Sequence, residues 1–197
     1  YNGSSWTEGN DVNTARFDLA AAGTQTAGII FSGDPYSATT ETYDGTSYTE
    51  VGDLNTARQK SAGFGAQPSA ICAGGEGPPG AQSITEIWNG SSWTETGDMN
   101  TARFGLAAAL KAPSSNGIVF GGYISNDSAL AETWDGTAWT ETGDLNTSRY
   151  YLAGSGTASS ALAFGGSQNP PTVANAEAWN GSSWTETGDL ATAREQI

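Results

Sequence analysis

The residues with the clearest chemical potential in this sequence are five arginines, each of which ends the same short phrase. The phrase reads Asp-x-Asn-Thr-Ala/Ser-Arg in four copies, and the fifth copy has Ala191 in place of the Asn. The arginines are Arg16, Arg58, Arg103, Arg149 and Arg194. Guanidinium groups gathered around one axis could bind an anionic ligand. The same groups could instead pair with carboxylates and hold the structure together.

The Asp-x-Asn spacing also invites comparison with a calcium-binding loop, which begins in this way. That reading would make Asp53, Asp98 and Asp144 metal ligands. The bidentate Glu that closes such a loop is missing from the phrase, and an Asx-turn explains the same spacing through hydrogen bonds to the backbone. We therefore predict no metal, with calcium at these three aspartates as the alternative.

Other chemistry is sparse in this chain of 197 residues, which contains no histidine and one cysteine. Histidine is the commonest general base and metal ligand. Cys72 lies in an apolar run at residues 70–73, where a small buried side chain is expected. A single cysteine forms neither an internal disulfide nor a metal cage. We predict that the protein is not an enzyme and has no cofactor.

The charge balance narrows the range of partners. Twenty-one acidic residues against seven basic ones give a net charge of −14. Such a chain repels nucleic-acid backbone and anionic membrane surface, so neither is an expected partner. The longest apolar runs, at residues 28–31 and 106–110, are far shorter than the roughly 20 residues of a membrane helix, so no membrane insertion is expected. The chain starts at Tyr1, within a repeat, which suggests a fragment of a longer polypeptide.

The elements that must position these residues form an internal repeat. A phrase of the type aromatic-Asn/Asp-Gly-x-x-aromatic-Thr-Glu occurs five times, with start positions 42, 45, 46 and 45 residues apart. Periods of this length are typical of propellers and arrays. We predict a single repeat domain over residues 1–197. Its repeats are residues 1–42, 43–87, 88–133 and 134–178, with a partial one at 179–197.

Each repeat predicts four short strands, a to d. Strand a follows the Arg, for example at residues 17–20, 104–107 and 150–153. Strand b is an apolar run ending in small residues, and its lack of alternation indicates burial on both faces. An Asn-Gly or Asp-Gly pair then joins strands c and d as a hairpin in which both residues accept positive φ.

The predicted fold is an all-β propeller of four-stranded antiparallel blades. It has four complete blades and an orphan strand d at residues 5–8, and is part of a five-bladed or larger ring.

The pattern resembles the kelch repeat over the whole chain. The residues that carry this resemblance are Gly-Gly at the end of strand b (Gly74-Gly75, Gly121-Gly122, Gly165-Gly166) and one aromatic on each of strands c and d. Two features depart from the kelch pattern: the first unit has Ser32-Gly33, and the two aromatics are one residue closer together. The phrasing is similar to kelch-like repeats of marine phages and bacteria, which implies a component of a phage particle.

Nearly all the large and charged residues fall at fixed repeat positions, which predicts structural roles. We expect each of the five arginines to form an ion pair or to bridge carbonyls between neighbouring blades, with Glu41, Glu86, Glu132 and Glu177 as partners. We expect the aromatic residues of strands c and d to pack between blades, although they could also stack on sugars. These tryptophans are Trp88, Trp93, Trp134, Trp139, Trp179 and Trp184.

The b–c loops are the segments that break the pattern, and they emerge on the same face as the d–a segments. We predict that this face makes the contacts, through Tyr36, Tyr123, Asn126 and Asn169. The predicted function is a non-enzymatic structural, adhesion or protein-interaction module of a virion (fibre, tail or capsid decoration) or another extracellular appendage. The alternative is a multivalent carbohydrate-binding lectin. Expected partners are other subunits of an assembly or a cell-surface glycan, with an oligomer that completes the open blade.

Overall fold

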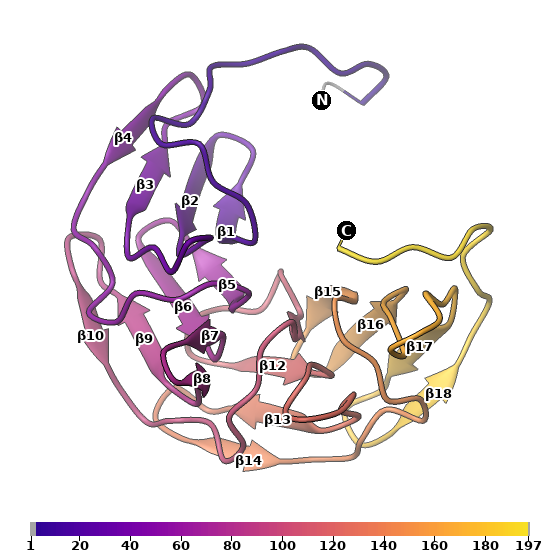
Figure 1. The fold of residues 1–197 in the computed structure, drawn as a ribbon. Coiled ribbons are helices and arrows are strands. Elements are labelled where there is room, and N and C mark those ends of the chain that lie inside the picture. The colour runs from indigo at the N-terminus through magenta and orange to yellow at the C-terminus, as the bar shows by residue number, and fades with distance from the viewer. Residues whose placement is uncertain (1–2, 197) are drawn as a thin grey trace.

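The computed structural model describes residues 3–196 and is a β-propeller of four four-stranded antiparallel sheets (Figure 1). The described residues contain strands, turns and loops but no helix. The predicted all-β propeller with four-stranded blades is therefore confirmed. Within each blade the first strand lies nearest the central axis and the last strand lies at the rim (Figure 1).

We name the blades A to D in chain order. Blade A contains β1 (Ala20–Thr24), β2 (Ala27–Phe31), β3 (Thr40–Tyr43) and β4 (Tyr48–Glu50). Blade B contains β5 (Ala62–Ala66), β6 (Ser69–Ala73), β9 (Thr85–Trp88) and β10 (Trp93–Glu95). Blade C contains β11 (Ala107–Ala108), β12 (Gly117–Phe120), β13 (Ala131–Trp134) and β14 (Trp139–Glu141). Blade D contains β15 (Ala153–Thr157), β16 (Ser160–Phe164), β17 (Ala176–Trp179) and β18 (Trp184–Glu186). The b–c loop of blade B adds a small hairpin of β7 (Glu76–Gly77) and β8 (Gly80–Ala81).

The innermost strands begin later than the sequence predicts. Strands were expected at 17–20, 104–107 and 150–153, but β1, β11 and β15 begin only at the last residue of each range. The cause is a residue with positive φ shortly before each strand, namely Asp18 (54°), Gly105 (62°) and Tyr151 (53°). Such a residue cannot continue an extended strand.

The c–d hairpins also differ from the prediction. Four residues separate Tyr43 from its partner Tyr48, and only the glycine has positive φ (95° at Gly45). Asp44 instead accepts hydrogen bonds from the backbone N–H groups of Thr46 and Ser47, both at 2.8 Å. The turn is therefore an Asx-type turn followed by a glycine, not a two-residue hairpin in which both residues have positive φ.

The predicted strand d at residues 5–8 is not a strand in the structure. A strand exists only as part of a hydrogen-bonded ladder. In the complete repeats, strand c ends five residues before strand d begins. The partner of the segment that contains Trp6 would therefore end at Tyr1, which lies outside the described residues. Trp6 on this segment is 84% exposed.

The tryptophans of the rim strands join each blade to the one before it. The Trp93 indole N–H donates to the hydroxyl of Thr40 in blade A at 2.9 Å, and its ring meets Phe31 edge-on with centroids 4.8 Å apart. Trp139 donates to Thr85 of blade B in the same way, also at 2.9 Å. The six tryptophans of blades B to D are each 6% exposed or less. The predicted packing of these six residues in the interior is confirmed.

The Asp-x-Asn-Thr-Ala/Ser-Arg phrase forms a clamp between successive blades. Asp53 accepts a hydrogen bond from the backbone of Thr40, in the blade that the chain is leaving, at 3.3 Å. Asn55 donates from its backbone and its side chain to Glu86 of the next blade, at 2.7 and 2.8 Å. Arg58 completes the contact through an ion pair of 2.5 Å with the same Glu86, and both side chains are fully buried.

This clamp recurs around the ring. The buried ion pairs are Arg16–Glu41, Arg58–Glu86, Arg103–Glu132 and Arg149–Glu177. The predicted pairing is confirmed for these four arginines. For Arg194 it is wrong within residues 3–196: this guanidinium is exposed, and its Nε donates to the carbonyl of Thr192 at 3.4 Å.

We predict that Glu132→Gln lowers the free energy of unfolding by about 3 kcal/mol, because it leaves the buried Arg103 without its counter-charge. Urea unfolding measures this change. Glu141→Gln is the matched control, since Glu141 lies directly opposite Glu132 in the ladder but is exposed. Equal effects of the two substitutions would show that the clamp contributes no special stability.

A second prediction concerns Trp184, whose buried indole N–H has no hydrogen-bond acceptor among the described residues. Its counterparts donate to Thr40 and Thr85, whereas the equivalent position in blade C is Ala131. Ala131→Thr supplies the hydroxyl and should raise the free energy of unfolding by about 1 kcal/mol. Ala131→Val has the same shape without the hydroxyl, so an equal gain with Val would exclude the hydrogen bond as the cause.

Candidate functional site

The b–c loops and the d–a segments lie together on one face of the propeller, which we call the loop face. Phe104 follows the clamp arginine and Tyr123 begins the b–c loop, and their backbones exchange hydrogen bonds of 3.1 and 2.7 Å. Gln59 and Glu76 form the equivalent bridge in blade B. The predicted emergence of both sets of loops on the same face is therefore confirmed.

Five equivalent residues surround the mouth of the central axis on this face. Each lies two positions after a clamp arginine, and each has positive φ. They are Asp18 (54°), Lys60 (55°), Gly105 (62°), Tyr151 (53°) and Gln196 (54°). The backbone N–H of each later member donates to the carbonyl of the one before it, at distances of 2.9, 2.9, 2.7 and 2.9 Å in chain order. We call this ring the axial collar.

The collar is the point at which the repeat stops being uniform. Glycine takes positive φ without cost, whereas a side chain there is strained, most of all a bulky one. Only Gly105 uses glycine, and the other four members are an acid, a base, a phenol and an amide. Strain retained at four unlike side chains is typical of a functional position.

Lys60 is held in its charged form by its neighbours. Its ammonium group pairs with Glu76 at 2.8 Å and lies over the rings of Phe104 and Tyr151, 5.2 and 5.8 Å from their centroids. Burial opposes the charge, but the hydrogen bonds and charge interactions with Glu76 and Tyr151 together outweigh it and raise the pKa of Lys60 above its ordinary value. Burial likewise opposes ionisation of Glu76, yet hydrogen bonds from Lys60 and Gln59 lower its pKa.

Asp18 is in the opposite situation. Burial raises the pKa of its carboxyl, with further contributions from the charges of Asp34 and Glu76, although Lys60 acts in the other direction. Burial also raises the pKa of the Tyr151 hydroxyl, against the effect of Lys60. Together with Asp34 and Glu76 beside it, the collar therefore places three carboxyl groups around one partly buried ammonium group.

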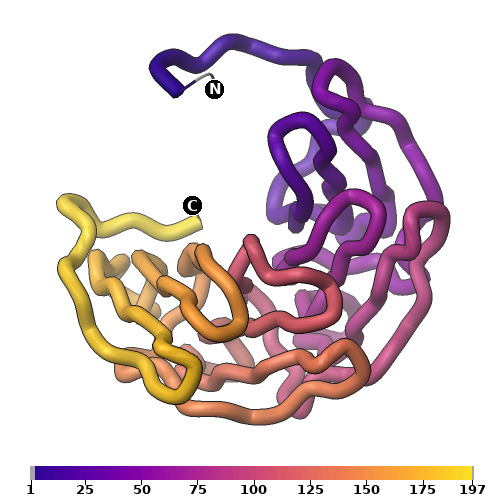
Figure 2. The backbone as a smooth tube through the Cα atoms, turned by 180° about the vertical axis from the view of Figure 1, so that it is seen from behind, coloured from indigo at the N-terminus to yellow at the C-terminus, as the bar shows by residue number. Residues whose placement is uncertain are grey.

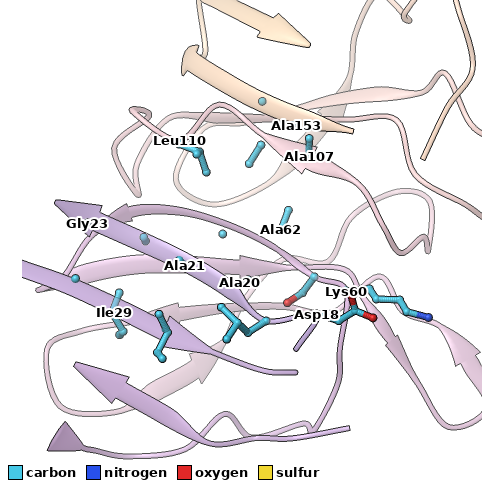
Figure 3. Close-up of a pocket in the computed structure, with 18 of the residues that line it drawn as sticks. Asp18, Ala20, Ala21, Gly23, Ile29, Lys60, Ala62, Ala107, Leu110 and Ala153 are labelled. Carbon is cyan, nitrogen blue, oxygen red and sulfur yellow. The ribbon is translucent and has the colours of Figure 1, made fainter. Parts of the chain in front are cut away.

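A cavity of about 730 Å³ runs along the axis from the collar (Figure 3). Asp18 and Lys60 lie at one end and Leu110 and Gly23 towards the other (Figure 3). Its walls include the alanines and glycines of β1, β5, β11 and β15. These residues are small because the inner strands nearly touch: a Cβ on Gly63 would lie 2.5 Å from the carbonyl oxygen of Ala21. The cavity has the size and the largely apolar lining of a ligand site.

The structure places the four predicted contact residues in three loops, with Tyr123 and Asn126 in the same loop of blade C. Tyr123 packs between Phe104 and Tyr150, with ring centroids 5.3 Å from each, and so belongs to the aromatic surface beside the collar. Tyr36 is 41% exposed in the b–c loop of blade A. Asn126 and Asn169 are exposed in the loops of blades C and D. The loops are on one face, but these four side chains do not form a single cluster.

Sequence reasoning missed the collar. The signal was available, since aligning the five copies on their arginines shows a column of five different residues, Asp, Lys, Gly, Tyr and Gln, two positions after the Arg. The sequence predicted that this column begins strand a, and the residue types there do not reveal the positive φ.

The aspartates that suggested a calcium site form hydrogen bonds with the protein backbone. Asp53, Asp98 and Asp144 each accept a backbone N–H from strand c of the blade they leave, at 3.3, 3.4 and 3.3 Å. This hydrogen bond links each aspartate to a different segment of the chain. It is therefore not the local Asx-turn that the sequence suggested in place of calcium. Within residues 3–196, no three acidic or cysteine side chains gather as a metal site would require. The same residues include no helix that could span a membrane.

The fold and the collar define the class of the protein as a β-propeller of four four-stranded blades with a polar collar at one mouth of its axis. No protein-family model matches the chain, and no curated protein is similar to it.

We predict that Asp18→Asn raises the free energy of unfolding at pH 7. Because the folded state raises the pKa of Asp18, ionising this carboxyl costs stability, and the cost disappears once the pH falls below the ordinary aspartate value. Asn tolerates positive φ as well as Asp does, so the backbone is unaffected. Denaturant unfolding at pH 7 and at about pH 3 tests this.

Asp11→Asn is the control for that measurement, because it removes one negative charge at an exposed position before the first clamp arginine. An equal gain from Asp11→Asn, or a gain from Asp18→Asn that persists at low pH, would contradict the explanation.

Proposed function

We propose that the protein is a non-catalytic interaction module that binds a protein partner through its loop face. The observation that carries this proposal is that the repeated side chains and the variable side chains lie in different parts of the structure. The four arginines and four glutamates of the ion pairs, and the six tryptophans of blades B to D, are buried in contacts within and between blades. Unlike side chains come together at the collar and in the b–c loops, which stand around the same mouth of the axis.

The chemistry of the collar favours binding over catalysis. A general acid or base works best when its pKa lies near the working pH. Lys60 has its pKa raised and is locked to Glu76, and Tyr151 also has its pKa raised. Both groups therefore keep their protons near neutral pH. The surplus of carboxylates from Asp18, Asp34 and Glu76 suits a partner that presents a cationic group.

The repeat supports a more specific assignment as a kelch-like propeller. Gly121 and Gly122 end the second strand of blade C with φ of 68° and 108°, and the counterparts in blades B and D do the same. On the similarity of this repeat to kelch-like repeats of marine phages and bacteria, we propose that the module belongs to a virion or another extracellular appendage. Its partners there are other subunits of the particle.

A carbohydrate-binding role receives less support. Sugar recognition by stacking needs an accessible aromatic face. The six tryptophans of blades B to D are buried, so the repeat does not provide one open tryptophan per blade.

Photo-crosslinking in the intact assembly tests the proposal. A photoreactive phenylalanine at Tyr36, on the loop face, should crosslink to a protein subunit. The same group at Thr49, which is exposed on the rim strand β4, is the control and should not. Equal crosslinking at both positions, or none at Tyr36, would contradict the proposal. Multivalent binding of the chain on a glycan array would favour the lectin instead.

A further inference from the structure

The ring of blades is open on one side, between blades A and D. Figure 1 and Figure 2 show the opening from opposite directions, with the segments that lead to both termini beside it. The three interfaces that do form, A–B, B–C and C–D, use the same repeat positions. The two blades that border the opening can therefore be compared with blades whose faces are covered.

The face of blade D towards the opening carries apolar residues at the positions that other blades bury. In blade C the side chains of Ile118 and Phe120 point at blade D, and both are 0% exposed, with Phe120 against the ring of Trp184 at 4.8 Å. The equivalent residues of blade D are Leu162 and Phe164. Leu162 is 37% exposed and Phe164 is half-buried. Apolar residues that other blades bury are thus left open here.

Blade A forms the other side of the opening. The opposite face of the second strand presents Cys72 in blade B, Val119 in blade C and Ala163 in blade D, all 0% exposed. The equivalent residue of blade A, Ile30, is only partly buried. Ile30 lies on the wall of the axial cavity, which extends here over the open face of blade A.

The last clamp is half made. Asp189 accepts the backbone N–H of Ala176 in blade D at 3.4 Å, as its counterparts do in the blades they leave. The other half of this phrase keeps the Arg but has Ala191 in place of the Asn, so the Arg alone is left to attach to the next blade. Arg58, Arg103 and Arg149 are 0% exposed in that role, whereas Arg194 is exposed.

The collar indicates how large the missing part is. Each collar residue precedes the innermost strand of one blade, so Asp18, Lys60, Gly105 and Tyr151 introduce blades A to D. Gln196 is a fifth member, already bonded to Tyr151 at 2.9 Å. It stands where the innermost strand of one further blade would begin.

We propose that the open side of the ring is a docking surface for one β-blade of the same repeat, carried by a partner chain. The occupant must bring a glutamate on its third strand to meet Arg194, and an innermost strand of small residues to fit the crowded axis. Its apolar faces cover Leu162 and Phe164 on one side and Ile30 on the other. The partner would bind by adding strands to the ring. Its contacts would repeat those of the three interfaces between the existing blades. This docking uses a different surface from the loop face and does not depend on the proposed function.

Co-expression of the whole chain with a tagged probe segment tests this inference. The probe is a separate copy of residues 153–179, which carries the first three strands of a blade and the glutamate at position 177. We expect the probe to co-purify with the chain at one copy per chain. Leu162→Asp in the chain should reduce capture at least about tenfold. Ile124→Asp should not, because Ile124 is equally exposed (40%) but lies on the loop face.

A charge exchange separates the predicted contact from a general loss of folding. Arg194→Glu in the chain changes an exposed residue, so the chain still folds, and it should abolish capture of the probe. A probe with Glu177→Arg should fail on the natural chain but bind the Arg194→Glu chain. Absence of capture, capture unaffected by Leu162→Asp, or failure of the exchange to restore binding would overturn the proposal.

Discussion

The buried ion pair between a clamp arginine and the glutamate on the third strand of the next blade is the interaction on which the structure depends. Arg103 and Glu132 lie 2.5 Å apart, with side chains 0% and 1% exposed. Taking two charges out of water is costly, and it is tolerated only with close geometry and further hydrogen bonds. Asn100 supplies them, through its backbone and its side chain, to the same carboxylate. In the four clamps that form, the Asn and the Arg therefore bind the same carboxylate, which explains why both residues recur in the phrase.

This constraint explains where the molecule can vary. A clamp fixes the chain at its arginine, and two residues later the backbone turns through positive φ into the innermost strand. The residue at that turn supplies none of the clamp contacts described above, so Asp18, Lys60 and Tyr151 can differ without loosening the ring. The b–c loops have the same freedom because they begin after the glycines that end the second strand. The positions that hold the architecture and the positions proposed for recognition are thus separate within each repeat.

Much of this arrangement could be predicted from the sequence, because it rests on repetition. The period gave the four-stranded blades, and the regular Arg and Glu positions gave the ion pairs. What failed depended on backbone conformation or on neighbours. The run after Arg149 reads as a strand, yet Tyr151 has positive φ, which residue type does not reveal. Residues 5–8 have the composition of strand d, but composition cannot supply a ladder. The four loop residues chosen as contacts share a face without sharing a site, because loop length sets their positions.

The most direct test of this account is a double-mutant cycle on Arg103 and Glu132. The free energies of unfolding of the natural chain, Arg103→Met, Glu132→Leu and the double variant give the coupling between the two side chains. If the clamp holds the blades together, the two losses are not additive, the coupling is about 2 to 3 kcal/mol, and the double variant is more stable than the worse single one. A coupling below about 0.5 kcal/mol, with additive losses, would contradict the central claim.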